Sequence, residues 1–147
     1  MSESIEPGPK KPSQEVRLSP DGDRALSEAQ NFCARANVAI VSAEHLLAGA
    51  LAVLSASGNA AVPARAALES ALMLTVGGAE AHSNQVMFGS AARDALNATA
   101  GAIRAAGGTT ISPQQIALGT IDSGDVNPMF YSSLGISRTA LRIAVSG

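Results

Sequence analysis

Few residues in this sequence have the types and spacing that catalysis or metal binding requires. Glu44 and His45 are adjacent, which could suggest an acid–base pair, but neighbours on a helix point about 100° apart. No second histidine stands four positions from His45, and His82 lies in a polar linker. Cys33 is the sole cysteine, which excludes an internal disulfide and a zinc site of several thiolates. We therefore expect no catalytic residue, metal or cofactor, and we interpret His45 as a capping or interface residue.

Longer catalytic motifs are also missing. The sequence contains no Gly-x-Ser-x-Gly and no cluster of Asp, Glu and His with catalytic spacing. It has no Gly-x-x-x-x-Gly-Lys-Ser/Thr loop, since its only lysines are Lys10 and Lys11. The sequence therefore predicts a protein that is not an enzyme.

The composition favours an all-α protein built as one domain. Hydrophobic residues make up 46% of the 147 residues but aromatic residues only 3%, so Ala and Leu must fill the core. A net charge of −2 with scattered arginines gives no reason to expect nucleic-acid binding. No apolar run approaches the ~18 residues of a membrane span, and no signal peptide opens the chain. We expect a soluble, cytoplasmic protein without membrane contact.

Capping residues predict where the helices that carry these side chains begin. Ser19 precedes Pro20 and an acid, and Ser42 precedes Glu44 and an apolar stripe that runs to about Ser57. Ser112-Pro113 opens a similar helix. Further helices are expected from Pro63 to Gly77-Gly78, from near Met87-Phe88 to Gly107-Gly108, from Asn127-Pro128 to Leu134-Gly135, and after Ser137.

An internal repeat relates the two halves of the chain. A constant offset of 70 places Ser42 on Ser112 and Gly49 on Gly119, and it matches small with small and large apolar with large residues over two helices. The register is lost after Gly58. Two such units, each unable to bury its own apolar stripe, should pack on one another about a pseudo-twofold axis.

The repeat resembles a known family, the N-terminal double-repeat domain of Clp-type AAA+ unfoldases of the ClpA and ClpC kind. Leu18-Ser19 occupies the place of the family's aromatic-Thr pair, and Ala29-Gln30-Asn31-Phe32-Cys33 occupies its helix centre. Glu44-His45-Leu46-Leu47-Ala48-Gly49-Ala50-Leu51 matches its signature. The second copy is degenerate, with Gln114-Gln115 in place of Glu-His, although Asn127 to Ile136 resembles a further family segment.

The resemblance implies an all-α fold of two pseudo-symmetric four-helix repeats, about eight helices in all. We expect a disordered tail over residues 1–17 and a double-repeat domain over 18–146, with repeat 1 at about 18–78 and repeat 2 at about 87–146. Because the ATPase motifs are missing, the chain is either the isolated domain of a longer protein or a stand-alone copy, and of these we expect the stand-alone copy.

The resemblance also suggests ligand contacts. By position, Ser19 and Glu44 correspond to a phosphoarginine-binding pair of the ClpC branch, whereas Gly89 and Gln114 leave the second repeat without one. Alternatively, Glu44 only complements the helix dipole. The family docks partners between its repeats, which suggests a docking groove lined by the large side chains of the second half: Met87, Phe88, Met129, Phe130 and Tyr131. Alternatively, these side chains simply fill the core.

These observations predict a non-catalytic binding module, an accessory or competitor in Clp-dependent proteolysis. The expected partners are Clp unfoldase or peptidase components, adaptor proteins, protein substrates, or small molecules that target such domains. The alternative is a structural helical scaffold or dimerisation protein that has lost docking.

Overall fold

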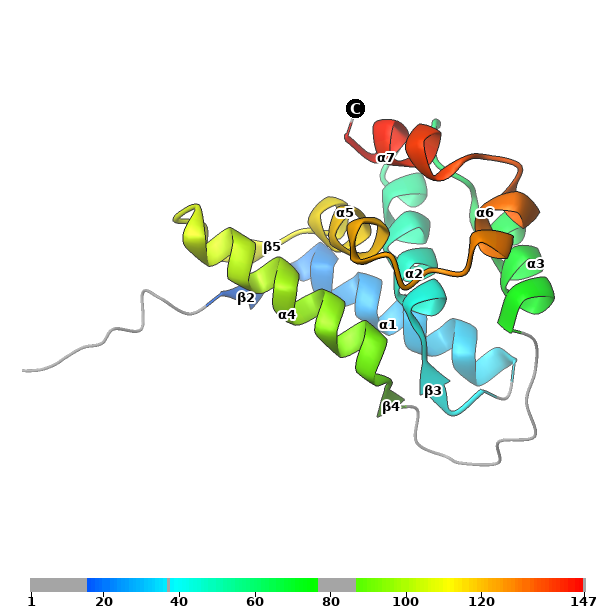
Figure 1. Cartoon of the computed structure of the whole chain (residues 1–147), viewed down its shortest axis with the longest axis horizontal. Helices are drawn as coiled ribbons and strands as arrows, with labels where there is room; N and C mark the ends of the chain where they lie inside the picture. Colours follow the sequence, from blue (N-terminus) through cyan, green and yellow to red (C-terminus); the bar gives the residue numbers. More distant parts are fainter. Residues whose placement is uncertain (1–15, 37, 77–86, 147) are drawn as a thin grey trace, which may run out of the picture.

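The computed structural model describes residues 16–36, 38–76 and 87–146. Most of the predicted tail and the linker with His82 lie outside these residues. Within them the chain forms seven helices and four two-residue strands (Figure 1). The helices are α1 Pro20–Arg35, α2 Ala43–Ala56, α3 Arg65–Val76, α4 Ser90–Ala105, α5 Pro113–Ser123, α6 Pro128–Leu134 and α7 Arg138–Ser146. The strands are β2 Arg17–Leu18, β3 Ile40–Val41, β4 Met87–Phe88 and β5 Thr110–Ile111.

The predicted caps form as hydrogen bonds. The Ser19 hydroxyl accepts from the Gly22 N–H at 2.9 Å. The Ser42 and Ser112 hydroxyls each accept from the backbone N–H three residues on, and the side chain of that residue accepts from the backbone N–H of the serine. Helices α2 and α5 therefore both begin with a capping box. The third helix begins at Arg65 rather than Pro63, because the first helical bond runs from the Leu68 N–H to the Ala64 carbonyl.

Two parallel strand pairs tie the repeats together, and the sequence did not predict them. Strand β2 pairs with β5 and β3 pairs with β4. The offset of 70 superposes β2 on β4 and β3 on β5, so each pair joins the entry of one repeat to the centre of the other. The expected pseudo-twofold arrangement is therefore built from crossed connections.

Among the described residues, the first repeat has three helices where the second has four, which gives one helix fewer than the resemblance implied. The offset places α6 on residues 58–64, which form turns. Gly58 has a φ of 107°, which ends α2. The Asn59 carboxamide then accepts from the Ala61 N–H at 3.0 Å and donates to the Ala144 carbonyl of α7 at 3.2 Å, which holds the segment as a turn.

Helix α2 is the centre of the core. Its residues from Ala43 to Val53 are all buried, and α1, α3 and α5 pack around it (Figure 1). Gly49 lets α1 approach closely, because a Cβ there would meet the Ala25 carbonyl and would lie 2.7 Å from the Ala29 nitrogen. Gly119 plays the same part between α5 and Thr99 of α4. A glycine thus marks the helix crossing in both repeats, but Gly49 lies against the backbone of α1 whereas Gly119 lies against the Thr99 side chain.

Candidate functional site

Ser19 and Glu44, the pair suggested for phosphoarginine, lie at opposite ends of α1. Helix α2 crosses α1 with Gly49 against Ala25 and Ala29, and His45 lines the same small cavity as Ala36, the residue just beyond the end of α1. Ser19 caps the other end of this 16-residue helix, so about 20 Å separates the two side chains. The structure does not bring the pair together.

The crossed strand pairs explain this separation. The Ser19 N–H donates to the Ile111 carbonyl at 3.0 Å, which places Ser19 beside the opening of α5. The Gly89 N–H donates to the Val41 carbonyl at 2.9 Å, which places Gly89 beside the opening of α2. The N-terminus of α5 therefore lies beside the first strand of the first repeat, and that of α2 lies beside the first strand of the second. Ser19 lies next to the second repeat, which has Gln114 at the position of Glu44.

Glu44 itself is engaged inside the protein. Its side chain is 6% exposed, and its Oε2 accepts from the Asn127 N–H at 2.6 Å. Asn127 caps α6, so the carboxylate joins the first turn of α2 to the start of a helix in the other repeat. Glu44 therefore makes a contact between the two repeats, in addition to the interaction with the helix dipole that the sequence suggested as the alternative.

His45 is the capping residue that the sequence predicted. Its Nδ1 lies 3.2 Å from the Ser42 backbone nitrogen, whose N–H it accepts, and 2.8 Å from the Ser42 hydroxyl. Burial lowers the pKa of His45 to about 4, although the charge of Glu44 acts in the opposite direction. The ring is therefore neutral at pH 7. The residues that the structure describes contain no group of three metal-ligating side chains.

The five residues proposed for a docking groove fall into two groups. Met87 and Met129 are 65% and 53% exposed, and Phe88 is half-buried. Phe130 is fully buried and Tyr131 nearly so, and their rings meet edge to face at 6.4 Å. The last two side chains therefore fill the core and offer no surface to a partner.

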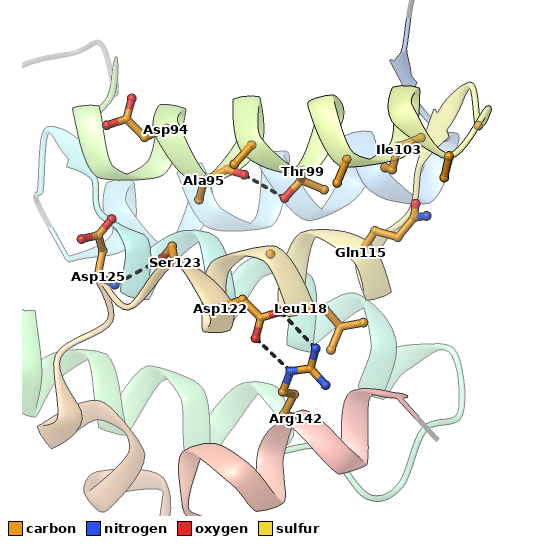
Figure 2. Close-up of a pocket in the computed structure, with 15 residues that line it drawn as sticks. Asp94, Ala95, Thr99, Ile103, Gln115, Leu118, Asp122, Ser123, Asp125 and Arg142 are labelled. Atoms are coloured by element: carbon orange, nitrogen blue, oxygen red, sulfur yellow. Dashed lines mark hydrogen bonds and ion pairs between the residues drawn. The ribbon is translucent and has the colours of Figure 1, made fainter.

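The described residues also form a groove of about 750 Å³ that the sequence did not reveal. It runs between α4 and α5, with α7 at its edge, and we call it the α4–α5 groove (Figure 2). Thr99, Ile103 and Leu118 line it, together with Gly119 and a row of α4 alanines that includes Ala98 and Ala102. It is an apolar trough with small side chains along one wall.

The same place in the first repeat is filled. The offset of 70 superposes Ala102 on Phe32, whose side chain is buried between α1 and α3. The Arg65 guanidinium lies over the Phe32 ring, 5.4 Å from its centroid, and forms an ion pair with Glu28. Only a cavity of about 80 Å³ remains beside Phe32. At the position of the Phe32 ring, the groove of the second repeat has only the methyl group of Ala102.

Charge is distributed unevenly along the groove. Asp94 and Asp125 lie at one end, and Ile103 and Gln115 lie at the other (Figure 2). On the α7 side, Arg142 donates two hydrogen bonds to Asp122 at 2.8 and 3.1 Å. These bonds lower the pKa of Asp122 below its ordinary value, so the carboxylate is ionised at neutral pH. The lining residues therefore include three carboxylates and one guanidinium.

Comparison with solved structures identifies the fold. The N-terminal domain of the caseinolytic protease associated chaperone ClpD from Arabidopsis thaliana superposes with a TM-score of 0.73 and covers 88% of this chain and 95% of its own. The chain has the fold of a Clp N-terminal domain. Sequence identity to ClpD is 19%, so the likeness concerns the fold alone. No family model matches the sequence, and no curated protein matches it.

The Clp N-terminal fold agrees with the all-α, two-repeat architecture expected from the sequence. No helix among the described residues is long and apolar enough to cross a membrane. The α4–α5 groove could have been suspected from residues 94, 98, 102 and 106, which share one helix face and are Asp, Ala, Ala and Ala. A face of this kind has no side chain large enough to reach a neighbouring helix.

Proposed function

We propose that this chain is a non-catalytic docking module that holds a segment of a protein partner in the α4–α5 groove. The observation that carries the proposal is the open groove of the second repeat beside the filled position of the first. A volume of about 750 Å³ lies within the range of ligand-binding clefts, roughly 300–1,000 Å³. Its lining, mostly apolar with a few polar groups, is also typical of such clefts.

The fold suggests the class of partner. ClpD is described as a chaperone associated with the caseinolytic protease. By analogy, the partners proposed here are components of a Clp-type system: unfoldase or peptidase subunits, adaptors, or proteins delivered for degradation. Small molecules that bind such domains belong to the same proposal. The chain would act as an accessory to these partners or compete for them.

Affinity capture with a groove-filling variant tests the proposal. Ala102→Phe introduces at the groove the side chain that the first repeat carries at Phe32, and Ala105→Phe adds the same ring to an exposed site outside the groove lining. The original chain and the Ala105→Phe control should recover Clp subunits, adaptors or degradation substrates, and Ala102→Phe should lose them. Equal recovery by all three proteins would refute docking in the groove.

One observation favours the scaffold alternative. Ile40 and Met87 are register partners of the β3–β4 pair, and both are more than half exposed. Two adjacent exposed apolar side chains of this size can contribute to a dimer interface. Light scattering separates the two functions, since a tight dimer that dissociates in Met87→Ser would support the scaffold and a monomer would support docking.

A further inference from the structure

We propose that the α4–α5 groove selects extended peptide segments that carry a large apolar or aromatic side chain and a basic residue about four positions apart. The inference rests on the proposed docking function and specifies its ligand. Two features of the groove support it: the position above Ala102 and the acidic end at Asp94 and Asp125.

The first repeat shows what fits above Ala102. At the equivalent position the Phe32 ring is buried against its own repeat, and it carries a guanidinium on one face. The second repeat has a helix crossing at the equivalent place, with Gly119 against the Thr99 side chain where Gly49 lies against the backbone of α1. Because the ring is missing and the α4–α5 groove is open beside Ala102, a ring from a partner can occupy this space. Burial of an aromatic side chain is the largest favourable contribution a short peptide can make there.

The acidic end of the groove selects the charge. Asp122 is neutralised by Arg142, but within the described part of the chain the Asp94 and Asp125 carboxylates make no ion pair. Both side chains lie at the same end of the groove, on α4 and directly after α5 (Figure 2). Two such carboxylates favour a lysine, an arginine or a free amino terminus and disfavour an acidic residue.

The spacing follows from helix geometry. Asp94 and Ala102 lie on one face of α4, eight residues apart, which corresponds to about 12 Å along the axis. An extended peptide advances about 3.3 Å per residue, so about four residues span this distance. Residues four apart in an extended segment also point to the same side. A ring above Ala102 and an ammonium at Asp94 can therefore come from one short segment.

Nuclear magnetic resonance titration of the full chain tests this selection. The probe is a nine-residue peptide of Ser, Ala and Gly with one Phe and one Lys four positions apart, made in both orders because the binding direction is open. The tighter of the two should shift the amide signals of Ala98, Ala102 and Gly119. Exchanging its Lys for Glu should weaken binding about tenfold, since an attraction is replaced by a repulsion, and salt should reduce the difference.

Protein variants locate the effect. Asp94→Asn with Asp125→Asn should lower the preference for Lys over Glu about threefold or more. Asp23→Asn, which removes a carboxylate from an exposed position of α1, should leave the preference unchanged. Ala102→Phe should abolish binding of the peptide. Together these outcomes would support both the ring position and the charged end.

The failures are distinguishable. If Lys and Glu peptides bind equally, or the Asp variants retain the preference, the inference is wrong, and docking stands as long as Ala102→Phe still blocks capture of partners. If neither peptide shifts the groove signals while Ala102→Phe still blocks capture, the ligand class is wrong and the groove remains a docking site. If Ala102→Phe affects neither peptide nor capture, the docking function itself is refuted.

Discussion

Replacing Gly49 with alanine tests the helix crossing on which both repeats depend. A Cβ at this position would meet the Ala25 carbonyl and would lie 2.7 Å from the Ala29 nitrogen and 3.0 Å from the Ala29 Cβ. Two of these three atoms belong to the backbone of α1, so no side-chain rotation relieves the overlap. Helix α1 or α2 must shift, and both are part of the core.

The expected cost follows from two opposing terms. Overpacking a close-packed site costs about 1–3 kcal/mol, and contact with the backbone puts Gly49→Ala near the upper end. Alanine in place of a helical glycine recovers about 1 kcal/mol. The net loss in the free energy of unfolding should therefore be about 2 kcal/mol, which lowers the Tm of a domain of this size by roughly 8 °C.

Gly101→Ala is the matched control. Gly101 lies inside α4, and a Cβ there would have no neighbour within 4 Å. Only the propensity term applies, so this variant should gain about 0.5–1 kcal/mol. Thermal and urea unfolding, followed by circular dichroism, measure both variants. A Gly49→Ala protein that is as stable as Gly101→Ala would show that α1 and α2 do not cross as closely as described.

Three further predictions concern single side chains. Folding lowers the pKa of His45 from 6.5 to about 4, so as the pH falls the unfolded chain binds a proton before the folded chain does. The stability that the neutral ring contributes is complete above pH 6.5 and is lost as the pH falls towards 4, by at most about 3 kcal/mol. Denaturant titrations of His45→Gln should lack this loss. Burial raises the pKa of Cys33 to about 12, so iodoacetamide should label this thiol only in denaturant; rapid labelling of the native protein would contradict its burial. Because Ser19 and Glu44 lie at opposite ends of α1, calorimetric titration with phosphoarginine should show no binding that Glu44→Gln removes.

The local parts of the fold could be predicted from the sequence because their causes are local. Ser19, Ser42 and Ser112 each bond an N–H within three residues, so a short stretch of sequence fixes each helix start. The repeat was visible because Gly49 and Gly119 must both be small to let the neighbouring helix approach. The Clp N-terminal fold was implied by the resemblance that Glu44 to Leu51 and the other motifs carry, and the comparison with ClpD confirms it.

The arrangement of the candidate sites could not be predicted in the same way. Strands of two residues carry almost no pattern of their own, and their partners are set by how the repeats dock. The crossed pairing moves Ser19 next to Ile111 and away from Glu44. A residue-by-residue transfer within one repeat cannot reveal this, because the surroundings of Ser19 and of Glu44 are both assembled from the two repeats.

The α4–α5 groove was missed for a different reason: it is defined by a side chain that is absent. Phe32 attracts attention in a chain with few aromatic residues, whereas Ala102 looks like one of many helical alanines. Only the superposition of the two repeats shows that Ala102 occupies the position of a core ring. The two copies of the repeat thus differ at this position. One copy keeps the buried ring with its covering guanidinium, and the other has an open groove at the equivalent position, where we propose that a ligand binds.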